Sequence, residues 1–279
     1  MLEVLIILLL VSASCSLIGS VLVLKDQAMI ADALSHSVLL GIVLGFFISH
    51  SLDSPLLMVG AALFGVVTVW FIDFLHTSKV EHDAATGIVY SFLFSVAVIL
   101  ISVFARNVHL DIDMVLMGEV LFAPLHRLDL FGLSLPVSMV KSAAMLVINL
   151  VFFSLVYQPL KLYLFDETQA RLSGGSVRFL SFATLLLVSM TTVFSFDAIG
   201  SMTVIVFLVA PSMGALLWSR SFWQFLLFAQ IIGAVNVFIG YSLALQFDLT
   251  MSGTCAVMSL LTYCLQLGIK KGQQKWSNK

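Results

Sequence analysis

An aspartate and a histidine four residues apart are the pair of side chains in this sequence best suited to chemistry. Asp32 and His36 lie in the stretch 25–45, KDQAMIADALSHSVLLGIVLG, which is otherwise mainly apolar. On a helix, residues four apart lie on one face, one turn from each other. A carboxylate oxygen and an imidazole nitrogen form a ligand set that suits Mn²⁺, Zn²⁺ or Fe²⁺. An Asp–His ion pair, or a network with Ser35 and Ser37, would explain the same residues without a metal, and one helix supplies only two ligands.

Composition places this pair in an apolar environment. The chain has 279 residues, of which 61% are hydrophobic and only 10% are charged, and its mean hydropathy is +1.12. A soluble domain of this length needs more charge than this to cover its surface, so the sequence predicts a protein embedded in the lipid bilayer. An ionisable residue inside a membrane is costly, which makes it a functional candidate by default. The net charge of −2 and the lack of a basic patch give no indication of nucleic acid as a partner.

Nine apolar segments approach the length of about 20 residues that a membrane-spanning helix needs. They are 5–24, 28–49, 55–75, 84–103, 137–157, 177–196, 201–218, 222–245 and 251–267. The sequence therefore predicts an all-α polytopic membrane protein with about nine transmembrane helices, eight being the alternative count. Residues 1–279 are expected to form a single transmembrane domain. The apolar stretch 114–125 is too short to cross, so it predicts a re-entrant or interfacial segment.

The positions of the cations orient these spans. If the N-terminus is outside and all nine segments cross, ten of the 13 Lys and Arg residues lie on the cytoplasmic side. This bias satisfies the positive-inside rule and predicts a cytoplasmic C-terminus. No connection is long enough for a nucleotide-binding module, and the P-loop pattern is absent from the sequence. The chain is therefore not expected to hydrolyse ATP itself, and uphill transport driven by ATP would need another chain.

Two polar connections, one on each side, have the residues to contact a partner. On the outer side, the segment 109–127 has acidic and imidazole side chains, and Gly118 and Glu119 within it suggest a folded re-entrant element that either docks a partner or collects cations. On the inner side, the connection 157–178 predicts a short amphipathic helix that ends at glycine. An ordinary interfacial helix and a helix that couples to a cytoplasmic ATPase explain this second pattern equally well.

A third polar cluster lies in the inner connection between the third and fourth segments. His76, Glu81, His82 and Asp83 are close together there. Two imidazoles and two carboxylates resemble a metal-binding set, whereas a short polar turn in water would have the same composition. The sequence leaves both interpretations open.

Taken together, these motifs resemble a known family. The stretch 32–38, DALSHSV, resembles the signature G-D-A-[IL]-S-H-[AS]-V of the bacterial ABC-type manganese, zinc and iron permeases, the ABC-3 group. In order along the chain, 83–87 resembles the start of the family's fourth span, 116–119 its re-entrant element, and 200–215 a later span with Pro211 aligned. The inner helix resembles the family's coupling helix F-D-x-x-x-A-x-x-x-G, with its positions taken here by Phe165, Asp166, Glu167, Ala170 and Gly174.

The resemblance implies a function and a set of partners. It implies a permease subunit in the bacterial plasma (inner) membrane that imports a divalent transition metal, with Asp32 and His36 as metal ligands in mid-membrane. No cofactor is expected to be bound permanently, because Mn²⁺, Zn²⁺ or Fe²⁺ is the cargo. The implied partners are a cytoplasmic ATP-binding subunit, an extracytoplasmic metal-binding protein and a second permease, identical or paralogous, that completes the site. The outer segment is most like the manganese branch.

The sequence departs from the family signature at two positions, and alternative functions remain open. Ala31 replaces the family's glycine and Leu40 its proline, so a kink after the site is not expected from proline. A proton-coupled secondary metal transporter would use the same pair as a proton relay. A non-transport intramembrane scaffold is a further alternative. An intramembrane metalloprotease is the least favoured, because the sequence has no H-E-x-x-H.

Overall fold

The structure is a bundle of long helices with one small hairpin. The computed structural model describes residues 1–50, 54–77, 79–104, 120–121, 123–125, 127–130, 133–172 and 176–277. The long helices are α1 (Leu2–Leu24), α2 (Ala28–Ser49), α3 (Pro55–Leu75), α4 (His82–Phe104), α6 (Val137–Phe165), α8 (Val177–Ile199), α9 (Ser201–Trp218), α10 (Phe222–Phe247) and α11 (Met251–Ser277). Eight of them are long and apolar enough to cross a membrane in the described chain, and α3 contributes a shorter apolar stretch, Val59–Leu75. The polytopic helical fold is thus confirmed, with a count of eight or nine spans.

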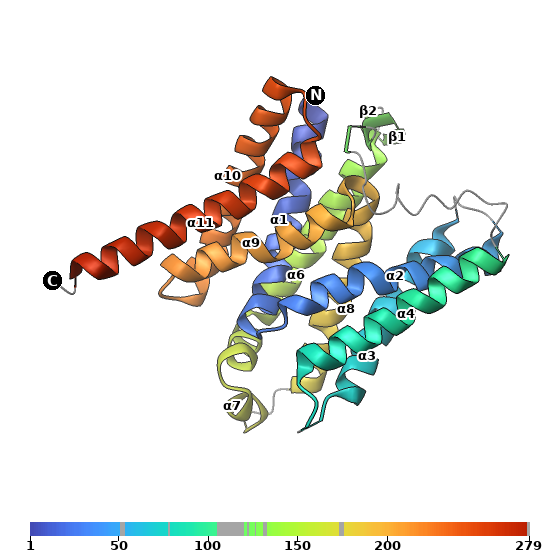
Figure 1. Cartoon of the computed structure of the whole chain (residues 1–279), viewed down its shortest axis with the longest axis horizontal. Helices are drawn as coiled ribbons and strands as arrows, with labels where there is room; N and C mark the ends of the chain where they lie inside the picture. Colours follow the sequence, from blue (N-terminus) through green and yellow to red (C-terminus); the bar gives the residue numbers. More distant parts are fainter. Residues whose placement is uncertain are drawn as a thin grey trace.

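Helix α1 is the centre of the bundle. It packs against α6, α8, α9 and α10, and 72% of its most apolar 18-residue window is buried. In contrast, only 17% of the corresponding windows of α4 and α11 is buried, so these two helices expose most of their surface to lipid or to a partner. Figure 1 shows α2, α3 and α4 grouped on one side of α1, with α10 and α11 on the other.

Small polar side chains join the central helices. The Ser20 hydroxyl lies 3.3 Å from that of Ser212 in α9, and the Asn149 amide in α6 donates to Ser14 at 2.9 Å and to Thr191 in α8 at 3.0 Å. In a membrane, helices associate through close packing and such hydrogen bonds, since lipid removes most of the hydrophobic driving force. These contacts hold α1, α6, α8 and α9 as one packed unit.

A two-stranded hairpin interrupts the all-α pattern and was not predicted from the sequence. Strands β1 (Arg127–Leu130) and β2 (Leu133–Pro136) pair antiparallel after a short 3₁₀ helix, Ala123–Leu125. Arg127 ties the hairpin to the start of α1, because its guanidinium makes two hydrogen bonds to the Glu3 carboxylate at 2.8 and 2.9 Å. The predicted re-entrant stretch 114–125 lies outside the described residues up to position 119, so that prediction remains a prediction.

The inner connection differs in its boundaries from the predicted helix. Helix α6 continues through Pro159 as far as Phe165, eight residues beyond the predicted end of that span at 157, and the separate helix α7 is only Glu167–Leu172. Phe165 therefore ends α6 rather than beginning α7. Helix α7 lies at the opposite end of the molecule from the N-terminus and the hairpin, as Figure 1 shows. The two ends of the bundle thus carry different polar structures.

Candidate metal site

The Asp32–His36 pair forms on α2 as the spacing predicts. The Asp32 Oδ1 and His36 Nε2 atoms are 3.6 Å apart, an ion-pair contact slightly longer than a hydrogen bond. The side chains are 36% and 24% exposed, respectively, although both neighbours of each in the sequence are buried. A carboxylate and an imidazole therefore reach the surface of one chain in the first half of an apolar helix.

Aromatic rings of α4 hold the imidazole in place. The His36 ring stacks on Tyr90 with ring centroids 5.6 Å apart, and Phe94 meets it edge-on at 5.4 Å. Within the described part of the chain, the buried His36 Nδ1 has no hydrogen-bond partner, while Nε2 points toward Asp32. The ring is therefore oriented by packing, with its Nε2 edge directed toward the Asp32 carboxylate.

The serines beside the pair do not bond to it. The Ser35 hydroxyl donates to the Asp32 backbone carbonyl at 2.7 Å, and the Ser37 hydroxyl donates to that of Leu34 at 3.4 Å. Both serine hydroxyls thus hydrogen-bond to backbone carbonyls of α2. This disfavours the alternative of a network of serine side chains around the pair. Within the described ranges, no group of three or more His, Cys, Asp or Glu side chains is arranged to hold a metal. The described part of one chain therefore presents two ligands at this position.

Close packing of α2 on α3 positions the pair. A Cβ atom added to Gly41 would lie 2.3 Å from the Gly60 carbonyl oxygen, and one added to Gly60 would lie 2.4 Å from that of Gly41. Helix α2 runs without interruption through the buried Leu40, which stands where the family pattern has proline. Gly41 permits the backbones to touch, which is a different role from the bend that the family's proline would provide.

The predicted coupling residues gather around α7 and the turn between α1 and α2. Asp166 caps α7, since its Oδ1 accepts a hydrogen bond from the Gln169 backbone N–H at 2.8 Å. Ala170 is buried, whereas Phe165 is 62% exposed and contacts Phe222 edge-on at 6.1 Å. The helix thus has one side against the protein and a large apolar residue displayed next to it.

Glu167 links α7 to the rest of the bundle. Its carboxylate accepts a hydrogen bond from Arg171 at 2.7 Å and forms an ion pair with Lys25 at 3.6 Å. The hydrogen bond from Arg171, assisted by the charge of Lys25, holds the pKa of the Glu167 carboxyl below its usual value. The Lys25 ammonium also lies 3.7 Å from the centre of the Tyr163 ring. Helix α7 is therefore attached to the inner ends of α1 and α6 by charge.

Some predicted site residues lie outside the residues that the structure describes. Other residues of interest were not predicted from the sequence. Gly118, Glu119 and Gly174 lie outside the described residues. Sequence reasoning missed Tyr90, which contacts His36 only because α4 packs on α2. It also missed Asp73. An acidic residue near the end of an apolar span is a functional candidate, and this was the available signal.

Comparison with known proteins supports this description. A family model described as the ABC 3 transport family matches residues 1–270. The manganese transport system membrane protein MntD of Bacillus subtilis is 39% identical over 255 residues, which are 91% of this chain and 86% of MntD. The zinc transport system membrane protein TroD of Treponema pallidum is 38% identical over 264 residues, 94% of this chain and 72% of TroD.

The fold also matches a solved structure. The structure of PsaBC from Streptococcus pneumoniae in complex with Fab superimposes with a TM-score of 0.78 at 22% identity, covering 95% of this chain and 89% of that one. A second match, an inward-facing conformation of a putative metal-chelate type ABC transporter, has a TM-score of 0.68 at 18% identity, with 95% and 85% covered. At these identities the likeness shows a shared fold.

Proposed function

The chain belongs to the ABC 3 transport family, and we propose that it is the membrane-spanning subunit of an ATP-driven importer for a divalent transition metal. Mn²⁺ is the proposed preferred cargo, with Zn²⁺ or Fe²⁺ as the alternatives. MntD, a manganese transport protein by name, is 39% identical to this chain, and TroD, a zinc transport protein by name, is 38% identical. The family and the predicted manganese-like outer segment support the choice, while N/O ligand chemistry alone favours Zn²⁺.

The observation that carries the proposal is the partly exposed Asp32–His36 pair in the first half of α2. Its two ligands come from one helix, and within the described chain no third ligand joins them. A second permease, identical or paralogous, would add its own carboxylate and imidazole to complete a four-ligand site. The exposed surface of the pair is available for such a partner.

The other partners follow from the two ends of the molecule. At the end with α7, a cytoplasmic ATP-binding subunit would contact Phe165 and α7 and supply the hydrolysis that this chain lacks. At the opposite end, an extracytoplasmic metal-binding protein would dock near the outer segment that includes Gly118 and Glu119. The proposed location is the bacterial plasma membrane, with the C-terminus in the cytoplasm, which the positive-inside bias supports.

Transport then requires only binding and a change of access. The cation is held by the deprotonated Asp32 carboxylate and the neutral His36 imidazole, because protons compete with metals for both groups. ATP binding to the partner would move α7, and the ion pair of Glu167 with Lys25 would carry that movement to the inner end of α1. The permease itself breaks no covalent bond.

Uptake of radioactive Mn²⁺ and Zn²⁺ by whole cells tests this function. Asp32→Ala and His36→Ala, at matched expression, should each reduce uptake by at least about tenfold, since even residues that only support metal ligands change affinity by this much. His50→Asn and Asp248→Asn remove an exposed imidazole and an exposed carboxylate elsewhere and should leave uptake unchanged. Normal uptake in both site variants would overturn the assignment. Uptake that collapses with an uncoupler while ATP is maintained would favour the secondary transporter instead.

A further inference from the structure

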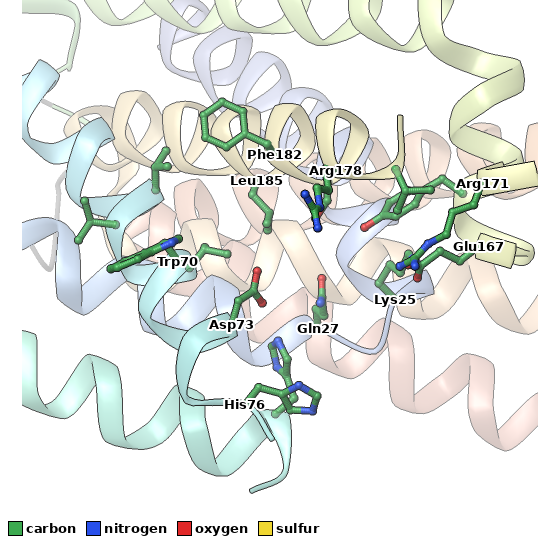
Figure 2. Close-up of a pocket in the computed structure, with 17 residues that line it drawn as sticks. Lys25, Gln27, Trp70, Asp73, His76, Glu167, Arg171, Arg178, Phe182 and Leu185 are labelled. Carbon is green, nitrogen blue, oxygen red and sulfur yellow. The ribbon is translucent and has the colours of Figure 1, made fainter. Parts of the chain in front are cut away.

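A cavity of about 1050 Å³ opens at the end of the molecule that carries α7. Figure 2 shows Asp73 and His76 together on one side of it and Lys25, Glu167 and Arg171 on the other. His82, at the start of α4, also lines it. The cavity therefore joins the coupling region to a group of side chains with oxygen and nitrogen donors.

Asp73, His76 and His82 have the chemistry of a cation site. The two imidazole rings have centroids 5.7 Å apart, and the Asp73 carboxylate interacts electrostatically with both of them. Imidazole and carboxylate together suit the first-row divalent metals. Asp73 and His76 are exposed to the cavity rather than buried in protein. A cation that enters the cavity can therefore reach them.

The state of His82 is the observation that points to a ligand. Within the described residues, both of its ring nitrogens are buried and neither has a hydrogen-bond partner. Leaving a buried polar group without a partner costs about 1–3 kcal/mol, so such a group calls for an explanation. Rotation of the His82 ring toward the cavity that it lines would let a bound cation or its water shell supply the missing partner to one of these nitrogens.

Helix α4 connects this group to the Asp32–His36 pair. Tyr90 stacks on His36, and Thr86 and His82 precede it at intervals of four, which places all three on one face of α4. Eight residues of α-helix span about 12 Å. His82 is thus two turns from the level of the first pair, in the direction of α7.

We propose that His76 and His82, together with Asp73, form a second and weaker divalent-cation site, which receives the ion after it leaves Asp32 and His36. This inference rests on the proposed metal-import function. No three ligands are already arranged around one point in the described chain, so the ion keeps several of its waters here. A site of this kind lowers the barrier to leaving the membrane without holding the ion tightly.

The opposite wall of the cavity explains why binding is weak. Arg178 points into the cavity in Figure 2, and Lys25 and Arg171 line it as well. Glu167 neutralises part of this charge by pairing with Lys25 and Arg171. A divalent cation at His76 and His82 is therefore attracted by Asp73 and repelled from across the cavity, which favours its release.

Mn²⁺ binding to the full transporter in lipid nanodiscs, measured from the EPR signal of free Mn²⁺, tests the inference. Wild type should show two classes of site. The double variant Asp32→Ala/His36→Ala should lose the tighter class and keep the weaker one. His76→Gln/His82→Gln should lose the weaker class and keep the tighter one, which also serves as evidence that this variant is folded. His50→Asn is the matched control and should bind as wild type does.

The outcomes separate this inference from the proposed function. If His76→Gln/His82→Gln binds Mn²⁺ as wild type does, or if wild type shows one class that Asp32→Ala/His36→Ala removes completely, the second site does not exist and the proposed function stands. If Asp32→Ala/His36→Ala keeps both classes of Mn²⁺ site, the proposed import site is wrong. The second site is then tested by His76→Gln/His82→Gln alone.

Discussion

His36 is held by aromatic packing rather than by hydrogen bonds. Tyr90 and Phe94 fix its ring from two directions, and Nδ1 has no partner within the described chain. Metal-binding histidines elsewhere are usually oriented by a hydrogen bond from the second ring nitrogen. At this position the neighbouring rings of α4 take over that orienting role.

Removing Tyr90 should therefore weaken cation binding without removing a ligand. We expect Tyr90→Ala to raise the KM for Mn²⁺ uptake by about tenfold, because the loss of an orienting neighbour costs metal sites this much. The control is Phe92→Ala, which truncates an aromatic side chain of the same helix that is 65% exposed and faces away from the site. Equal KM values for Tyr90→Ala and wild type would show that stacking does not position His36.

The sequence predicts the Asp32–His36 contact but not its surroundings. A spacing of four on one helix is a local property, so pairing within α2 follows from the residues alone. The contact of His36 with Tyr90 depends on how α2 and α4 pack. These residues are 54 positions apart in the sequence, and no local pattern predicts a contact at that separation. Asp73 was missed because a single acid at the end of an apolar run does not show which side chains from α4 will face it.

At the scale of elements, glycine decides how closely α2 and α3 approach. Gly41→Val should lower the free energy of unfolding by about 1–3 kcal/mol, as overpacking of a tight contact does, because its side chain would meet the Gly60 backbone. Gly87→Ala is the control, since nothing lies within 4 Å of the added Cβ. Thermal unfolding in detergent compares the two variants, and an equal Tm for Gly41→Val and wild type would contradict the close approach.

Charge attaches α7 to the bundle, and this contact should respond to acid in a defined direction. Since the pKa of Glu167 is held below its usual value, its ion pairs contribute fully at neutral pH and are lost only as the pH falls through that lowered pKa. A surface pair of this kind contributes about 1 kcal/mol or less. Glu167→Gln should thus speed amide hydrogen exchange in α7 by up to about fivefold at pH 7.

The same measurement distinguishes a charge effect from a general loss of structure. After correction for intrinsic rates, wild-type exchange in α7 should be equal at pH 7 and pH 5.5, where Glu167 remains ionised. Glu81→Gln, an exposed carboxylate in the turn before α4, should leave α7 unaffected. Exchange in α7 that is the same in Glu167→Gln and wild type would show that these ion pairs do not hold the helix.

Element boundaries were predictable to different extents. The bounds 28–49, 55–75 and 201–218 agree with α2, α3 and α9, because a polar turn residue ends each apolar run. The end of α6 was not predictable, since Pro159 indicates a break that the neighbouring helices override. The hairpin was missed because two strands of four residues give too short an alternation to stand out from a loop.

At the scale of the whole molecule, the described salt bridges other than Asp32–His36 lie at two opposite ends. Glu3 and Arg127 pair at one end, and Lys25, Glu167 and Arg171 at the other. The apolar lengths of α1 and α6 connect these ends. This division agrees with the orientation that the distribution of cations predicts, with α7 on the cytoplasmic side.

The chain supplies half of the proposed cation site, so the whole molecule has to be understood as one member of a pair. Helix α4 is mostly uncovered and carries the rings that contact His36, and the Asp32–His36 pair itself remains partly exposed. Composition predicts a membrane protein without any of this detail. The incomplete ligand set on one helix is the reason for proposing that a second permease completes the site.

The most direct measurement of this central claim is the number of Mn²⁺ ions that the assembled transporter binds at its tighter class of site. The account predicts one ion for every two permease subunits, with this binding lost in Asp32→Ala and in His36→Ala. One ion bound for each permease subunit, or tight binding that survives both substitutions, would contradict it.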